Sequence, residues 1–257
     1  MTRRKVTDFV KGGGPYVWIT AYDYPTAKLV DEAGVDGILV GDSLGMVVLG
    51  YLNTLSVKLS DMVRHTEAVA RARPKALVVA DMPFMTYETG FRDALRNASR
   101  LIKAGADAVK LEGGVEYVDV IEKLVKAGIP VMGHIGLNPQ RVLTLGGFRQ
   151  VGKTEEQKRK ILQDAKALRD AGVFSIVIEF VPPHVAKEVT EAVDVPTICI
   201  GAGPHCDGQI LVLHDVIGLT PKPPSFAKRY VDVASVIKNA VAEYVREVRE
   251  RKFPPEI

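Results

Sequence analysis

The sequence predicts an α/β fold: a single (β/α)8 TIM barrel spanning residues 1–257, with a short N-terminal segment and a long C-terminal helix. Three observations support this prediction. Short apolar runs alternate with helical patterns along the chain, which is typical of a parallel sheet. Seven clear runs and a weaker eighth match the strand number of a barrel, whose usual length is about 250 residues. An Ala-Gly pair ends four helical patterns just before a run, where glycine supplies a left-handed helix cap (33–34, 104–105, 127–128 and 171–172).

The predicted strands are short and apolar on both faces, as expected of strands buried in a parallel sheet. In chain order they are Val17–Ala21, Gly37–Val40, Ala76–Ala80, Ala108–Leu111, Pro130–Gly133, Phe174–Ile178, Pro196–Ile200 and Ile210–Leu213. The alternative is an open, doubly wound sheet. That fold would need a glycine-rich phosphate loop after the first strand, whereas Tyr22-Asp23-Tyr24-Pro25 follows it, so the barrel is favoured.

The predicted helices have apolar residues at spacings of three and four. They are Ser60–Arg73, Glu88–Ala104, Tyr117–Ala127, Thr154–Ala171 and Val231–Arg251. Ser60 and Thr154 are expected to cap the helices that they begin. We interpret His65 as a surface residue of its helix.

Charge and cysteine content restrict the class of partner. The chain has 34 Lys and Arg against 31 Asp and Glu, a net charge of +3 without long runs of one sign, which argues against nucleic-acid and membrane partners. Asp8 and Lys11 interrupt the basic start where a signal peptide would need an apolar core. The two cysteines, Cys199 and Cys206, match neither a CxxC pair nor a disulfide framework, so we expect a reducing, cytoplasmic environment.

Carboxylates stand at the ends of three consecutive predicted strands. Asp42, Asp81 and Glu112 follow the second, third and fourth strands, and in a barrel these strand ends meet at one mouth. Carboxylates this close repel one another unless a proton or cation neutralises them. An all-oxygen set suits a hard divalent ion, so the sequence predicts a Mg²⁺ site.

Further polar residues surround these acids. Lys110 lies two residues before Glu112 and faces the same side, where an anionic substrate group could dock. Glu179 ends the sixth strand and is a candidate general base. His134 ends the fifth strand. Each of these residues, considered alone, is also explained by a structural role: capping a helix, forming an ion pair or, for the histidine, hydrogen bonding in the core.

A serine hydrolase is the rival interpretation. The segment 41–45 reads Gly-Asp-Ser-Leu-Gly and satisfies the G-x-S-x-G pattern, with Ser43 as the nucleophile. Such an enzyme needs a histidine that activates the serine. The match is short, and it leaves Asp81, Lys110, Glu112 and Glu179 without a role.

Six segments in order resemble the ketopantoate hydroxymethyltransferase family. They are Ile-Thr-Ala-Tyr-Asp-Tyr from 19, Val-Gly-Asp-Ser-Leu-Gly-Met from 40, Ala-Asp-Met-Pro-Phe-Met from 80, Val-Lys-Leu-Glu-Gly-Gly from 109, Gly-His-Ile-Gly-Leu from 133, and Gly-Ala-Gly with Asp-Gly-Gln-Ile-Leu-Val from 201. The resemblance implies a Mg²⁺-dependent barrel of the phosphoenolpyruvate/pyruvate type. It implies hydroxymethyl transfer from methylene-tetrahydrofolate to 3-methyl-2-oxobutanoate, giving 2-dehydropantoate on the route to pantothenate and coenzyme A.

The resemblance also assigns roles. The family's metal ligands fall on Asp42, Asp81 and Glu112, and its keto-acid contacts fall on Asp42, Ser43, Asp81 and Lys110. Its proposed base falls on Glu179 and a supporting histidine on His134. Family members commonly form decamers, which implies a homo-oligomer here.

The chain departs from the family around the predicted seventh strand. The family often has glycine at Cys199, and Pro204-His205-Cys206 is unlike the commonest loop. These differences bear on contacts near the pterin, which could be a modified one. A related Mg²⁺-dependent lyase that cleaves a carbon–carbon bond next to a 2-oxo acid, and a non-catalytic binding barrel, remain alternatives.

Overall fold

The computed structural model describes residues 3–255, so Met1 and Thr2 of the basic start lie outside the described residues. The chain divides into two compact units, residues 1–211 and 212–257, which are described separately. The predicted single domain over 1–257 stays a prediction.

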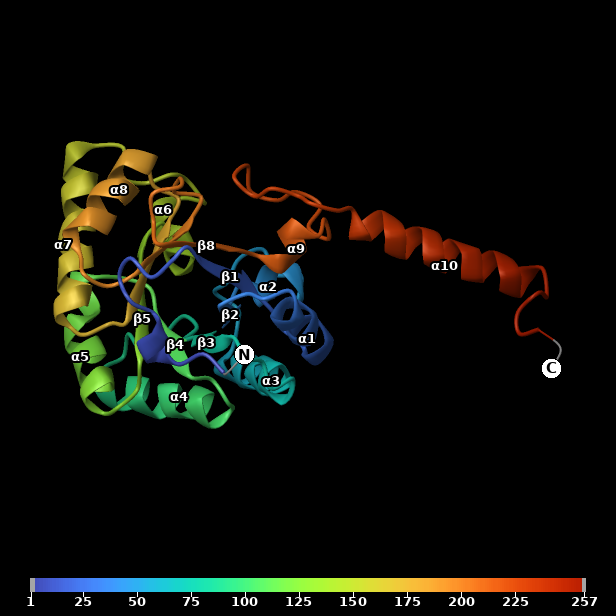
Figure 1. The fold of residues 1–257 in the computed structure, drawn as a ribbon, viewed down its shortest axis with the longest axis horizontal. Helices are drawn as coiled ribbons and strands as arrows, with labels where there is room; N and C mark the ends of the chain where they lie inside the picture. Colours follow the sequence, from blue (N-terminus) through green and yellow to red (C-terminus); the bar gives the residue numbers. More distant parts are fainter. Residues whose placement is uncertain (1–2, 256–257) are drawn as a thin grey trace. The chain divides into compact units, whose positions relative to one another are not determined.

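The first unit is a closed barrel of eight parallel strands (Figure 1). The strands are β1 (Tyr16–Thr20), β2 (Gly37–Val40), β3 (Leu77–Asp81), β4 (Ala108–Lys110), β5 (Val131–Gly136), β6 (Ser175–Glu179), β7 (Thr197–Ile200) and β8 (Gly208–Leu211). The barrel closes because β1 pairs with both β2 and β8, with Trp18 opposite Gly37 on one side and Ile210 on the other. The predicted fold class is confirmed.

Helices surround the strands of the first unit (Figure 1). They are α1 (Tyr24–Glu32), α2 (Leu44–Val47), α3 (Leu59–Arg71), α4 (Phe91–Lys103), α5 (Val118–Lys126), α6 (Val142–Leu145), α7 (Glu155–Asp170) and α8 (Pro183–Ala192), with short 3-10 turns at Val6–Asp8, Val115–Tyr117 and Pro139–Arg141. The long predicted helices are present, with ends shifted by one to three residues.

Two predictions about side chains on α3 are wrong. The helix begins at Leu59, and the carboxylate of Asp61 accepts the backbone N–H of Lys58, so Ser60 is not the cap. His65 is half-buried rather than on the surface, with its Nδ1 2.5 Å from the carbonyl oxygen of Tyr22. By contrast, Thr154 caps α7 as predicted, because its hydroxyl accepts the N–H of Gln157.

Apolar side chains from all eight strands fill the barrel interior. The short N-terminal segment adds Phe9, whose ring centroid lies 4.9 Å from that of Tyr16 and 5.1 Å from that of Trp18. Because apolar side chains fill the interior, the polar residues at the C-terminal ends of the strands are the candidates for catalysis.

The second unit contains α9 (Leu213–Val216) and α10 (Val233–Arg249). Asp232 caps α10 by accepting the N–H of Ser235, which confirms the long predicted C-terminal helix to within two residues at each end. None of the helices in residues 3–255 is both long and apolar enough to cross a membrane.

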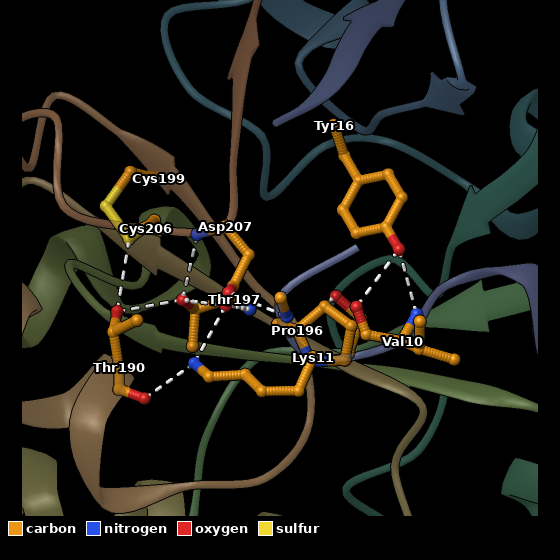
Figure 2. Close-up of polar contacts among 11 residues, drawn as sticks. Val10, Lys11, Tyr16, Thr190, Pro196, Thr197, Cys199, Cys206 and Asp207 are labelled. Atoms are coloured by element: carbon orange, nitrogen blue, oxygen red, sulfur yellow. Dashed lines mark hydrogen bonds and ion pairs between the residues drawn. A yellow bond between two sulfur atoms is a disulfide. The ribbon is translucent and has the colours of Figure 1, made fainter. Parts of the chain in front are cut away.

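The expectation that the two cysteines form no disulfide is wrong, because Cys199 and Cys206 are bonded to each other (Figure 2), and the cysteine content therefore no longer supports a reducing environment. No helix lies between β7 and β8 in the described chain, so residues 201–207 return along β7. Gln209 of β8 then pairs with Cys199 of β7, and the Cα atoms of the two cysteines lie 5.6 Å apart. A spacing of seven residues without a recognised motif gave no sign of this return path.

A polar cluster beside the disulfide ties the same loop to its surroundings (Figure 2). The Asp207 carboxylate accepts the backbone N–H and hydroxyl of Thr197 at 2.9 and 3.0 Å and pairs with Lys11 Nζ at 2.9 Å. Lys11 also donates to the carbonyl oxygen of Thr190 in α8. The loop between β7 and β8 is therefore fixed both covalently and by charge.

Candidate active site

The residues predicted to carry chemistry converge at the C-terminal mouth of the barrel. Asp42 and Ser43 follow β2, Asp81 ends β3, Lys110 ends β4 with Glu112 just beyond, His134 lies in β5 and Glu179 ends β6. Parallel strands place these side chains at the same end of the barrel. Asp42, Asp81, Lys110, Glu112 and His134 are each at most 4% exposed, which is unusual for so many ionisable groups in one place.

Lys110 is the central cation of the mouth. Its Nζ lies 3.0 Å from Asp81 Oδ1 and 3.2 Å from His134 Nδ1, so it links β3 to β5. Burial alone would lower the pKa of Lys110, but Asp81, Glu112 and Asp42 together raise it above its usual value. Lys110 therefore stays protonated and can hold an anionic group.

The three carboxylates carry more negative charge than Lys110 balances. Asp81 Oδ2 accepts the backbone N–H of Asp42 at 2.9 Å, which brings the two acids together. Burial, and then the charge of Asp81, raise the pKa of Asp42 to about 7. Burial, and then Asp42, raise the pKa of Glu112 well above its usual value. The mouth thus favours uptake of a proton or a cation.

This donor set fits a hard divalent cation in its chemistry, because all its ligand atoms are oxygens and it lacks balancing positive charge. However, among residues 3–255 no group of three or more His, Cys, Asp or Glu side chains is spaced as a ready metal site. Lys110 instead contacts Asp81 directly. Metal ligation by Asp42, Asp81 and Glu112 stays a prediction.

His134 joins Lys110 to Glu179. Its Nδ1 faces the Lys110 ammonium, and its Nε2 lies 3.1 Å from Glu179 Oε2. Burial, and then Lys110, lower the pKa of His134 well below its usual value, so the ring is neutral. Since Nδ1 must accept from the ammonium, the ring proton belongs on Nε2, which lies close to Glu179 Oε2 but is not aligned to donate a hydrogen bond to it.

Glu179 has the properties of a base that works near neutral pH. Its side chain is 16% exposed, more than the other acids of the mouth. Burial raises the pKa of Glu179 to about 7, against an opposing effect of Lys110. A group with this pKa is matched to proton transfer near pH 7.

Ser43 does not lie in a hydrolase arrangement. Its Oγ is 2.8 Å from the hydroxyl of Tyr22, while the buried His134 contacts Lys110 and Glu179. The serine is half-buried at the start of α2. This geometry disfavours the serine hydrolase interpretation.

Two residues of the mouth were missed from the sequence, Gln140 and Tyr87. Gln140 donates from Nε2 to Asp42 Oδ2 at 2.8 Å and from its backbone N–H to Glu112 Oε2 at 3.0 Å. Tyr87 donates its hydroxyl towards Gln140 Oε1 at 2.9 Å. Both lie in loops after strands, and that position is the only sequence signal that could have drawn attention to them.

Comparison with known proteins identifies the family. A family model described as ketopantoate hydroxymethyltransferase matches residues 1–256. The 3-methyl-2-oxobutanoate hydroxymethyltransferase of Pyrobaculum aerophilum is 81% identical over 98% of this chain and 96% of that protein. The protein of the same name from Ignicoccus hospitalis is 60% identical over 100% of this chain and 97% of its own length.

Solved structures share the fold at low sequence identity. A crystal structure of phosphonopyruvate hydrolase has a TM-score of 0.65 and 15% identity, covering 100% of this chain and 90% of that one. A crystal structure of 2,3-dimethylmalate lyase, described as a member of the PEP mutase/isocitrate lyase superfamily, has a TM-score of 0.57 and 17% identity, covering 95% of this chain and 85% of that one. These likenesses support the barrel, and the full-length matches show that the chain belongs to the ketopantoate hydroxymethyltransferase family, enzymes of pantothenate and coenzyme A biosynthesis that transfer a hydroxymethyl group to 3-methyl-2-oxobutanoate.

Proposed function

We propose that the chain enolises 3-methyl-2-oxobutanoate with the help of Mg²⁺ and adds to it a hydroxymethyl group from methylene-tetrahydrofolate or a modified pterin. The observation that carries this proposal is the Glu179–His134–Lys110 chain beside three buried carboxylates. It supports a base of near-neutral pKa at Glu179 and an ammonium at Lys110 in the same mouth. A 2-oxo acid needs both, a base for the C3 proton and a cation for the carboxylate.

In this proposal Asp42, Asp81 and Glu112 hold the Mg²⁺. Bound there, Mg²⁺ would polarise the keto oxygen and make the C3 proton of the keto acid more acidic. The fold neighbour phosphonopyruvate hydrolase is described in complex with oxalate and Mg++, which supports the proposal of a metal in a barrel of this fold.

The remaining roles belong to the chain's own side chains. Lys110 binds the substrate carboxylate, and Asp42, Ser43 and Asp81 contact the keto acid. Glu179 takes the C3 proton onto its carboxylate. His134 remains neutral, and its Nε2 lies beside the Glu179 carboxylate, where the ring limits the positions that this base can take. The C3 carbon, left with the electron pair of its C–H bond, then forms a bond to the one-carbon unit. The bonds between that unit and the pterin nitrogens break, and water supplies the hydroxyl oxygen, so that the products are 2-dehydropantoate and the tetrahydropterin.

Proton exchange tests the first half of the reaction without any pterin. The protein is incubated with 3-methyl-2-oxobutanoate in D₂O, with Mg²⁺ or with a chelator, and loss of the C3 proton is followed by NMR. We expect exchange that requires Mg²⁺ and disappears in Glu179→Gln. The surface variant Glu188→Gln, which removes a carboxylate that pairs with Lys158 on the outside of the barrel, should exchange like the wild type.

The opposite results would count against the proposal. Exchange that persists with the chelator would remove the metal from the reaction. Exchange that persists in Glu179→Gln would assign the base to another group. No exchange in any sample, even after the pterin is added, would reject the keto-acid chemistry.

Two further expectations stay predictions. The family resemblance implies a homo-oligomer, expected to be a decamer, and a cytoplasmic location was expected from the cysteine content. Light scattering on the purified full chain measures the number of subunits.

A further inference from the structure

We propose that Gln140 is a positioning residue, which orients the Asp42 and Glu112 carboxylates for the cation and leaves one oxygen of each available to it. This inference rests on the proposed function, because it concerns the same cation. Gln140 lies in the 3-10 turn Pro139–Arg141 after β5, whereas Asp42 follows β2 and Glu112 follows β4. It therefore joins two acids that no single strand could align.

Gln140 binds the two carboxylates through different groups, its side-chain amide and its backbone N–H. Gln140 Nε2 donates to Asp42 Oδ2 at 2.8 Å and to the carbonyl oxygen of Met82 at 3.0 Å, which uses both protons of the amide nitrogen. The backbone N–H of Gln140 donates to Glu112 Oε2 at 3.0 Å. Gln140 therefore binds one oxygen of each carboxylate, Oδ2 of Asp42 and Oε2 of Glu112. The second oxygen of each carboxylate does not contact Gln140.

Tyr87 fixes which way the Gln140 amide points. The Tyr87 hydroxyl lies 2.9 Å from Gln140 Oε1 and 3.0 Å from the carbonyl oxygen of Glu112. A flipped amide would turn its oxygen towards two acceptors, Asp42 Oδ2 and the Met82 carbonyl. Gln140 is 4% exposed and Tyr87 is 2% exposed, so water cannot replace these bonds.

The physical need for such a residue follows from the soft terminal torsion of a carboxylate. The last torsion of Asp and Glu has broad, shallow minima, so packing alone does not fix the oxygens. Two carboxylates that repel each other would rotate apart unless donors hold them. Partners that orient metal ligands in this way typically change metal affinity by about 10- to 100-fold when they are removed.

The test compares Gln140→Met with Gln157→Met. Met keeps the length of the side chain but has no donor. Gln157 makes a purely structural contact, accepting the N–H groups of Gly152 and Lys153. Isothermal titration with Mg²⁺ alone should show at least about 10-fold weaker binding in Gln140→Met and unchanged binding in Gln157→Met. In steady-state assays, the Mg²⁺ concentration for half-maximal rate should rise far more than kcat falls.

Tyr87→Phe provides an independent variant should Gln140→Met not fold. It removes the hydroxyl that holds the amide, and it should weaken Mg²⁺ binding in the same direction by a smaller factor. Mg²⁺ binding within twofold of the wild type in the folded Gln140→Met protein, or in Tyr87→Phe where only that variant folds, would overturn the inference.

The failure of this inference can be told apart from failure of the proposed function. If the wild type itself binds no Mg²⁺, the proposed function fails. The crystal structure of metal-free Gln140→Met then tests whether Gln140 orients the two carboxylates. Rotated Asp42 and Glu112 carboxylates would support the positioning role. Carboxylates that keep both positions would refute it.

Discussion

Replacing Asp42 by Asn should stabilise the metal-free protein at alkaline pH. Burial and Asp81 raise the pKa of Asp42 from 3.8 to about 7 in the folded state. Each pKa unit corresponds to about 1.36 kcal/mol, so a difference of about 3 units means that ionised Asp42 lowers the free energy of unfolding by about 4 kcal/mol. Asn removes the charge, and its amide oxygen can still accept from Gln140 Nε2.

The pH dependence of the stability gain distinguishes removal of a buried charge from better packing of the Asn side chain, which would act equally at every pH. Because the folded-state pKa lies above the unfolded one, the cost is absent below about pH 4 and complete above about pH 7. Asp42→Asn should therefore gain about 4 kcal/mol at pH 8 but only about 2 kcal/mol at pH 5.

Guanidinium denaturation with a chelator, at equal protein concentrations, measures the free energy of unfolding of both proteins. The exposed Asp194 gives a matched control, Asp194→Asn, which should change little at either pH. Added Mg²⁺ should stabilise the wild type more than Asp42→Asn. A loss of stability at pH 8, or equal gains at pH 5 and pH 8, would refute the reasoning.

Three further results are expected. The rate of C3 proton exchange should rise with pH through about 7, because Glu179 must be ionised to act as the base and burial raises its pKa to about 7; a flat rate between pH 5 and 8 would contradict this role. Gly136→Ala should lower stability in thermal denaturation by more than about 2 kcal/mol, because Gly136 has a φ of +92° and a Cβ would lie 2.3 Å from the carbonyl oxygen of Glu179. Reducing the Cys199–Cys206 bond, which closes a separation of seven residues, should cost about 2 kcal/mol; the reductant should have no effect on a variant with serine at both positions.

The sequence was informative where structure depends on local pattern. Strand positions, the helix cap at Thr154 and the acids at the strand ends could all be predicted, because periodicity and capping act over a few neighbouring residues. The alternation of strands and helices was enough to predict a barrel, and parallel strands necessarily bring their ends to one mouth. Asp42, Asp81, Lys110, Glu112, His134 and Glu179 lie together for this reason.

Contacts between distant residues could not be predicted in the same way. Gln140 and Asp42 are 98 positions apart, and only the closed barrel brings the amide to the carboxylate. Cys199 and Cys206 are close in sequence, yet their bond depends on a loop that returns along β7 without a helix.

The sequence by itself thus determined the barrel, the family and the acids of the mouth. The tertiary structure decided how Lys110, His134 and Glu179 are joined, which carboxylates have raised pKa values and which residues hold them. The physical reason is that burial and long-range hydrogen bonds set charge states, and both exist only once the strands have closed.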